Sequence, residues 1–258
     1  MTGGLGPRVL VTVPVFNEAP RIGKTLATLR KALRGAGLNY TLSVSEDGST
    51  DGTKDMLALL QSEDSDLLVQ THPSKKGRGW ALRTLWTGKS YDVFAFCDAD
   101  LASGPEALVE AINLAISGQD IVVGSRHTTG SSVHRPPVRN IVSHAYNAAL
   151  RAIFNTGILD HQCGLKVFNR TTIENILPLS LEDSWFWDTE ILVIAKAVGI
   201  HVYEMPVDWV ETKNGRTQLR RLLSDVYLHG TGILRLKSRS FSLPPNRKGN
   251  GNSATLTE

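Results

Sequence analysis

The stretch VFAFCDADL, residues 93–101, decides the fold, because an apolar run of strand length ends there in two carboxylates. The run VLVTVPVF at residues 9–16 has the same buried-strand character, and apolar residues at helical spacing follow it. Three further strand-like runs, YTLSVSEDG (40–48), LLVQT (67–71) and DIVVGSR (120–126), alternate with helix-like segments. This alternation predicts an α/β protein whose mainly parallel sheet carries helices on both faces.

Polar clusters stand where three of these strands end, and open α/β sheets bind ligands at the carboxyl ends of their strands. The clusters are Glu46-Asp47, Asp98-Ala99-Asp100 and Ser125-Arg126. A kink after the strand lets Asp98 and Asp100 approach one divalent cation, which prefers oxygen ligands; an exposed acidic turn is the alternative. Residues 46–52 are also open to two interpretations, a helix N-cap turn or an acid that accepts hydrogen bonds from a nucleobase.

The character of the chain changes after Arg126. Residues 127–137 predict a loop, and Val138 to Phe154 a helix with one apolar face. IHVYEMPVDWVE (200–211) predicts an antiparallel edge strand, because Pro206 interrupts it. Leu219 to Leu236 has amphipathic helix spacing. We therefore expect an α/β domain over 1–212, an amphipathic helix region over 213–237 and a disordered tail over 238–258.

Composition limits the class of protein. The chain has 258 residues, 41% of them hydrophobic and 21% charged, which is typical of a globular protein. No apolar run approaches the ~18 residues of a membrane-spanning helix. Two cysteines exclude a disulfide scaffold or a four-cysteine zinc site and favour a reducing compartment. Because the start of the sequence also lacks an export signal pattern, we expect a cytoplasmic protein.

Charge is unevenly distributed along the chain. Residues 213–248 contain nine Lys or Arg but one acid, Asp225. A basic end on an otherwise acidic body favours an anionic partner such as nucleic acid, phosphate or a lipid surface. A solvated tail is the alternative for residues 238–258.

Several motifs together carry a family resemblance. VPVFNE (13–18), SEDGSTDGT (45–53), KKGRGWAL (75–82), FCDADL (96–101) and VVGSR (122–126) occur in the order and spacing of family 2 glycosyltransferases. RNIVSHAYNAALR (139–151), DHQCGLKVF (160–168), WFWDTEIL (185–192) and EMPVDWVE (204–211) resemble the polyprenol-phosphate branch of that family. The branch includes dolichol-phosphate mannosyltransferase and dolichyl-phosphate β-glucosyltransferase. The resemblance covers about residues 8–236.

The resemblance implies a GT-A (Rossmann-like) fold and inverting transfer of a hexose from UDP-glucose or GDP-mannose to a polyprenyl phosphate. Mg²⁺ or Mn²⁺ is the implied cofactor, and nucleic acid is not an implied partner. The implied donor-binding residues are Pro14, Phe16, Glu18, Ser45, Asp47, Asp98, Ala99 and Asp100. Asp98 and Asp100 are the implied metal ligands, with Asp100 the more direct one.

The resemblance also implies an acceptor-phosphate site, formed by Arg126, Arg139, Ser143, Lys213 and Arg216. Asp100, Arg126, Arg139 and Asp188 are the candidate catalytic residues. Because a phosphate is already anionic, Asp188 is an optional base. Further polar positions near the transferred sugar are Asp160, Gln162, Lys166, Asp188 and Glu190.

Some positions depart from the branch or remain ambiguous. Ala102 stands where mannosyltransferases often carry Gln, and Gly215-Arg216-Thr217-Gln218 lacks the usual Lys after Gly. The Gln-Cys-Gly at 162–164 resembles the glucosyl-transferring relatives and favours UDP-glucose. His127, His134 and His144 are loop histidines by default, with a catalytic role as the alternative. Trp185-Phe186-Trp187 fits either a sugar-stacking platform or core packing.

Three rival functions remain open. They are a sugar-nucleotide pyrophosphorylase, a glycosyltransferase with a soluble sugar or protein acceptor, and a non-catalytic sugar-nucleotide binder. The glycines at 3–6 precede the first strand, where a pyrophosphorylase signature would follow it.

For the lipid-acceptor function we expect peripheral binding to an anionic membrane surface. The expected docking elements are the helix from Val138 to Phe154 and the basic helix from Leu219 to Leu236. The expected lipid-facing cations are Arg220, Arg221, Arg235, Lys237 and Arg239. Packing of the second helix on the catalytic domain is the alternative.

Overall fold

The computed structural model describes residues 6–210, 229–239 and 241. The strands are β1 (Arg8–Val15), β2 (Asn39–Glu46), β3 (Leu68–Thr71), β4 (Val93–Cys97), β5 (Ile121–Ser125), β6 (Ser132–His134), β7 (Leu165–Asn169), β8 (Val202–Pro206) and β9 (Asp208–Val210). The helices are α1 (Ile22–Gly35), α2 (Thr53–Glu63), α3 (Arg78–Trp86), α4 (Pro105–Ile116), α5 (Pro137–Phe154), α6 (Arg170–Ile176) and α7 (Trp187–Ala197), with a short 3₁₀ turn at Leu177–Leu179. Residues 229–237 are also helical.

A seven-stranded sheet in the order β3-β2-β1-β4-β7-β5-β8 forms the centre of the molecule. All neighbouring pairs are parallel except those of β7, which runs antiparallel to β4 and β5. The predicted mainly parallel α/β sheet is thus confirmed. β6 and β9 form a separate parallel pair. The order reverses between β1 and β4, which is where open sheets of this type form their ligand crevice.

The edge strand differs from the sequence prediction. β8 is at the edge, but it runs parallel to β5, with Val123 opposite Glu204 and Ser125 opposite Pro206. The antiparallel prediction was wrong because Pro206 is the last residue of the strand, where a missing N–H does not constrain strand direction. The antiparallel strand is β7, which the sequence analysis did not identify.

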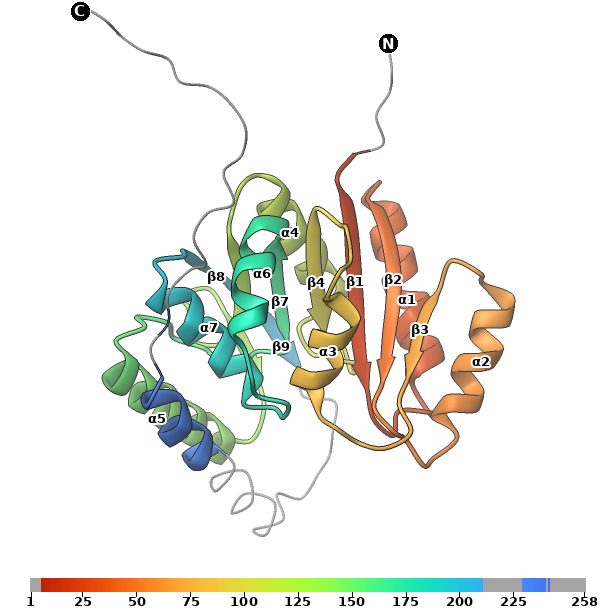
Figure 1. Cartoon of the computed structure of the whole chain (residues 1–258). Coiled ribbons are helices and arrows are strands. Elements are labelled where there is room, and N and C mark those ends of the chain that lie inside the picture. Colours follow the sequence, from red (N-terminus) through yellow and green to blue (C-terminus); the bar gives the residue numbers. More distant parts are fainter. Residues whose placement is uncertain (1–5, 211–228, 240, 242–258) are drawn as a thin grey trace, which may run out of the picture.

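Two apolar clusters hold the helices on the sheet. Alternate β1 residues such as Val9, Val11 and Val13 pack with α1, α2 and α4, whereas Leu10 packs with α3, α6 and α7 on the other face. Figure 1 shows α3, α6 and α7 in front of the sheet. Buried faces on both sides fix the strands, and their carboxyl ends therefore form a rigid edge for a site.

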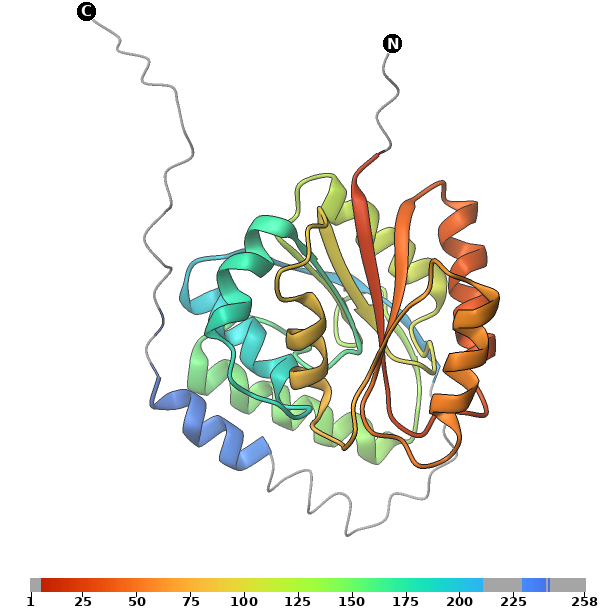
Figure 2. The ribbon, with the colours of Figure 1, turned by 45° about the vertical axis from the view of Figure 1, so that its right-hand side comes forward.

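The helical residues 229–237 pack on the domain formed by residues 6–210, beside α5 (Figures 1 and 2). Leu236 is buried with Phe186 and Val193, and a side chain at Gly232 would overlap the Phe186 ring. For the helix expected from Leu219 to Leu236, the alternative to membrane docking was packing on the protein, and the described part of the helix does pack in this way. The rest of that helix lies outside the described residues, as do positions 240 and 242–258 of the expected tail.

Two of the expected lipid-facing cations have protein partners. Arg235 pairs with Glu182 at 2.8 Å, and Arg239 pairs with the buried Glu190. Arg239 also donates to the carbonyl of Leu179. Arg239 therefore binds the end of the helical segment 229–237 to α7 and to the turn at Leu179. The guanidinium of Arg239 faces the protein, unlike the lipid-facing position expected for it. Arg220 and Arg221 lie outside the described residues.

Within the described ranges, none of the helices combines the length and the apolar character needed to cross a bilayer.

Candidate active site at the carboxyl ends of the strands

The ends of β1 and β2 carry the predicted donor-binding residues. The Asp47 N–H donates to the carbonyl of Val15 at 2.9 Å, which ties the two strand ends together. The carboxylate of Asp47 accepts the backbone N–H groups of Lys76 at 2.6 Å and Gly77 at 2.8 Å. The ammonium of Lys75 lies 3.9 Å from the centre of the Phe16 ring. Asp47 thus holds the 75–77 loop over the aromatic floor formed by Phe16.

The other predicted donor residues surround this loop. Ser45 is fully buried, and its hydroxyl donates to the carbonyl of Ala81 at 3.3 Å. Pro14 lies in β1 opposite Ser45. Glu18 pairs with Arg21 at 2.8 Å. These contacts place the five predicted residues of this half of the site along the ends of two adjacent strands.

Asp98 and Asp100 follow β4 at the point where the sheet order reverses. Leu101 has a φ of +48°, and its N–H donates to the carbonyl of Asp98 at 3.0 Å. This left-handed residue produces the kink predicted after the strand. Asp100 is partly exposed, with Oδ1 3.3 Å from the N–H of Ala102. The kink therefore leaves Asp100 accessible next to Asp98.

Arg78 bridges Asp98 and Asp188, and the sequence analysis did not single it out as a site residue. Its guanidinium pairs with Asp98 and donates to Asp188 Oδ2 at 2.7 Å, and its side chain is 5% exposed. Burial raises the pKa of Asp98 to about 6, against the opposing charge of Arg78. KKGRGWAL at 75–82 is one of the motifs that carry the family resemblance, but the motif assigned no role to Arg78.

Asp188 is held from two sides by cations. Lys166 Nζ lies 3.0 Å from Asp188 Oδ1 and also donates to the carbonyl of Cys163 at 2.8 Å. Both Lys166 and Asp188 are buried. Both carboxylate oxygens of Asp188 are therefore engaged, Oδ1 by Lys166 and Oδ2 by Arg78. The geometry gives Asp188 the part of positioning Arg78.

Gly164 lets β7 approach the carboxylate pair. Its carbonyl accepts the N–H of Asp98 at 3.0 Å, and a Cβ at this position would overlap the Asp98 carboxylate. Glycine at this point of DHQCGLKVF is therefore required by close approach.

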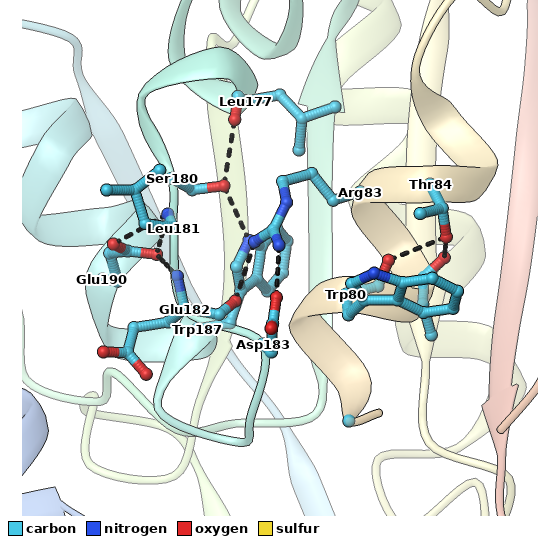
Figure 3. Close-up of polar contacts among 12 residues, drawn as sticks. Trp80, Arg83, Thr84, Leu177, Ser180, Leu181, Glu182, Asp183, Trp187 and Glu190 are labelled. Carbon is cyan, nitrogen blue, oxygen red and sulfur yellow. Dashed lines mark hydrogen bonds and ion pairs between the residues drawn. The ribbon is translucent and has the colours of Figure 1, made fainter. Parts of the chain in front are cut away.

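The loop before α7 packs against α3, and Figure 3 shows Arg83 of α3 in contact with Glu182 and Asp183 of this loop. Glu190 accepts the N–H groups of Leu181 and Glu182, and Trp187 Nε1 donates to Ser180 Oγ at 3.2 Å. Side chains at Gly77 and Gly79 would overlap the backbone of this loop. Glu190, predicted to lie near the sugar, is thus fully buried and binds the loop.

For the aromatic triplet 185–187, the sequence allowed either core packing or a platform for sugar stacking, and the three residues differ in this respect. Phe186 and Trp187 are fully buried core residues. Trp185 is 53% exposed, and the Arg78 guanidinium carbon lies 3.7 Å from its ring centre. Trp185 is therefore the member of the triplet that faces the site.

Arg126, one of the predicted acceptor-phosphate residues, forms a buried bidentate pair with Asp160. Arg126 Nε donates to Asp160 Oδ2 at 2.7 Å and Nη2 to Oδ1 at 2.8 Å. Burial acts to raise the pKa of Asp160, but the charge and hydrogen bonds of Arg126 outweigh it and hold the pKa well below its usual range. Glu204 fixes the Asp160 loop by accepting the backbone N–H of Asp160 at 2.9 Å.

The other predicted acceptor residues gather at the start of α5. Ser143 Oγ lies 2.9 Å from Nε2 of His127, and the His127 ring contacts His144 in a tilted arrangement with centroids 4.0 Å apart. Arg139 occupies the first turn of α5 and, with Arg126, acts electrostatically on Arg135. The structure therefore brings Arg126, Arg139 and Ser143 into one basic region, whereas Lys213 and Arg216 lie outside the described residues.

α5 turns its apolar side away from the protein. Ser143, Asn147 and Leu150 are its buried residues, whereas Val138 is 62% and Ile141 68% exposed. Val142 and Ile153 are exposed as well. An outward apolar face thus begins beside the basic region and continues along the helix.

A parallel α/β sheet with paired carboxylates at its switch point and a separate basic region is the arrangement of a group transferase that uses a nucleotide donor. The chain belongs to glycosyl transferase family 2, which it matches over residues 10–177.

Two curated relatives illustrate the similarity. The glycosyltransferase AglD of Haloferax volcanii is 33% identical over 233 residues, which are 89% of this chain and 37% of AglD. The dolichyl-phosphate beta-glucosyltransferase of Saccharomyces cerevisiae is 28% identical over 229 residues, covering 81% of this chain and 69% of the relative. This chain therefore spans little more than a third of AglD.

A solved structure supports the GT-A fold. Glucosyl-3-phosphoglycerate synthase from Mycobacterium tuberculosis, crystallised with Mn²⁺, UDP-glucose and phosphoglyceric acid, superimposes with a TM-score of 0.68. The match covers 90% of this chain and 80% of that chain at 19% identity.

Proposed function

We propose that this chain is an inverting hexosyltransferase that moves glucose from UDP-glucose to a polyprenyl phosphate, with GDP-mannose as the alternative donor. The observation that carries the proposal is the outward apolar face of α5, which begins in the same first turn as Arg139 of the basic region. A lipid phosphate has matching parts, an anion for the basic region and a hydrocarbon chain for the apolar face. A soluble acceptor would need only the first of these.

The donor is proposed to lie across the ends of β1, β2 and β4. Phe16 and the 75–77 loop held by Asp47 would border the nucleoside, and Asp98 and Asp100 would border the diphosphate. Among the described residues, no group of three or more His, Cys, Asp or Glu side chains would hold a metal ion. Two carboxylates completed by phosphate oxygens nevertheless fit Mg²⁺ or Mn²⁺. When bound, the metal would neutralise charge on the leaving diphosphate.

The acceptor phosphate is proposed to attack the anomeric carbon directly. One phosphate oxygen forms the new bond as the bond to the nucleotide diphosphate breaks, and the configuration inverts. The nucleophile is already an anion at neutral pH, so a strong base is unnecessary. The double pairing of Asp188 supports a positioning role in such a mechanism.

Transfer of label into lipid tests the function. The chain is incubated with detergent-dispersed polyprenyl phosphate, Mg²⁺ or Mn²⁺, and radiolabelled UDP-glucose or GDP-mannose, and the mixture is extracted with organic solvent. We expect acceptor-dependent label in the organic phase, more from UDP-glucose, and at least 100-fold less with Asp100→Asn. More label from GDP-mannose than from UDP-glucose would identify GDP-mannose as the donor.

Other products would overturn the lipid acceptor. Label that stays in water and depends on an added sugar or peptide would identify a soluble acceptor. Formation of a nucleotide sugar from a hexose 1-phosphate and a nucleoside triphosphate would identify a pyrophosphorylase.

We also propose that the enzyme meets its acceptor as a peripheral protein on the cytoplasmic face of a membrane. Ile141→Glu should reduce co-sedimentation with vesicles of anionic lipid, because it places a charge in the apolar face of α5. Leu59→Glu is the matched control, since Leu59 is 54% exposed on α2. Equal binding by both variants would exclude α5 as the docking surface.

A further inference from the structure

We infer that Arg135, assisted by His127 and Thr128, binds the acceptor phosphate, and that Arg126 supports this site through Asp160 without being its main ligand. The inference rests on the proposed function and names ligands that the resemblance did not imply.

Three buried polar atoms without a hydrogen-bond partner in the described structure lie between β5 and α5, on the two sides of the short strand β6. They are Nδ1 of His127, Oγ1 of Thr128 and Nη2 of Arg135. Leaving a buried donor unsatisfied costs roughly 1–3 kcal/mol, so such groups are rare in folded proteins. The charge of Arg135 acts on His127, so these unpartnered groups between β5 and α5 indicate a place for a ligand with several acceptor oxygens.

The fork of Arg135 is already oriented. Its Nε donates to Oδ1 of Asn140 at 2.9 Å, which anchors one side of the guanidinium to the first turn of α5. The unpartnered Nη2 lies beside Nε on the same edge of the planar group, and its second hydrogen points along the terminal edge. A preorganised guanidinium of this kind matches phosphate geometry and loses little conformational freedom on binding.

The charges around Arg135 favour an anion. Burial, together with the positive charges of Arg126 and Arg139, lowers the pKa of Arg135 to about 10. The nearby carboxylate of Asp160 is engaged by Nε and Nη2 of Arg126. Arg126 and Arg135 thus lie near the same carboxylate, and the N-terminus of the 18-residue helix α5 adds its dipole. A phosphate would supply the missing negative charge.

His127 offers a neutral donor to the same ligand. Burial is the main cause that lowers its pKa to about 4, so the ring is uncharged at neutral pH. When Nε2 accepts the hydroxyl proton of Ser143, Nδ1 carries the ring hydrogen and can donate it. Ser143 then orients the His127 ring, which explains how Ser143 contributes to the acceptor site.

Steady-state kinetics of Arg135→Met and Arg135→Lys test the assignment. Arg151→Met is the matched control, because Arg151 lies on α5, is partly buried like Arg135 and donates only weakly to the carbonyl of Ile158 at 3.5 Å. We expect the KM for polyprenyl phosphate to rise at least tenfold in Arg135→Met and about threefold in Arg135→Lys. The KM for the nucleotide sugar should stay within twofold of wild type in all three variants.

Calorimetric titration with farnesyl phosphate and with inorganic phosphate gives a readout that does not need turnover. Wild type and Arg151→Met should bind farnesyl phosphate, and Arg135→Met should bind it at least tenfold more weakly. Comparable binding of inorganic phosphate would assign the site to free phosphate. If wild type binds farnesyl phosphate but forms no labelled lipid, the proposed function fails while the phosphate site stands.

Three results would overturn the inference. They are an unchanged acceptor KM in a folded Arg135→Met variant, a rise confined to the KM of the nucleotide sugar, and farnesyl phosphate affinity equal to wild type. Thermal unfolding of each variant checks its fold, and Arg135→Lys keeps the test valid if Arg135→Met fails to fold.

Discussion

Replacing Arg78 with Met should destabilise the protein by about 3 kcal/mol and weaken donor binding. The substitution removes the cation between Asp98 and Asp188 but keeps an unbranched side chain in the buried space. Breaking a buried ion pair typically costs 3–5 kcal/mol. The lower end applies because Lys166 still pairs with Asp188 at 3.0 Å and Asp98, whose side chain is 24% exposed, can bind a proton.

Urea unfolding and nucleotide titration measure the two effects. With an m value of about 3 kcal/mol/M, the midpoint should fall by roughly 1 M. Affinity for the nucleotide diphosphate should fall at least tenfold, because the Asp98 carboxylate loses the partner that positions it.

Arg83→Met is the matched control on the same helix. Arg83 pairs with Asp183, whose side chain is 52% exposed, so its loss should cost about 1 kcal/mol or less. Equal losses of stability in the two variants, or unchanged donor affinity in Arg78→Met, would refute the role assigned to the Arg78 bridge.

Three further predictions follow from individual contacts. Gly164→Ala should lower turnover at least tenfold by displacing the Asp98 carboxylate, whereas Gly23→Ala, in open space on α1, should be silent; equal activity would contradict the close-approach argument. Asp47→Ala should weaken nucleotide binding at least tenfold in calorimetry, because the 75–77 loop loses its acceptor, and normal affinity with lost turnover would exclude this role. Burial lowers the pKa of His161 from 6.5 to about 3, so the unfolded state binds more protons over that range and stability should fall on acidification by ~5 kcal/mol at most. In urea unfolding from pH 7 to pH 4, His161→Gln should lose less stability than wild type, and identical pH profiles would refute the assignment.

The site was only partly accessible from the sequence. Apolar runs ending in polar residues identified Asp98 and Asp100 at a strand end, and ordered motifs identified Asp47, Arg126, Arg139 and Ser143. Arg78 escaped notice because its partners Asp98 and Asp188 are 20 and 110 residues away. No local pattern distinguishes such an arginine from a solvated one. Burial and a second carboxylate make the difference, and both arise from packing.

What the sequence by itself determined was the alternation of strands and helices, since side-chain periodicity is a local property of the backbone. It also determined that α5 has one apolar face. Only the tertiary structure decided which side of α5 is buried. Ser143, Asn147 and Leu150 are buried against the rest of the protein, whereas Val138 and Ile141 are exposed. The tertiary structure likewise decided the direction of β8, which depends on the path of the chain through α6 and α7. These choices depend on contacts between distant segments, whose free energies local residue patterns do not contain.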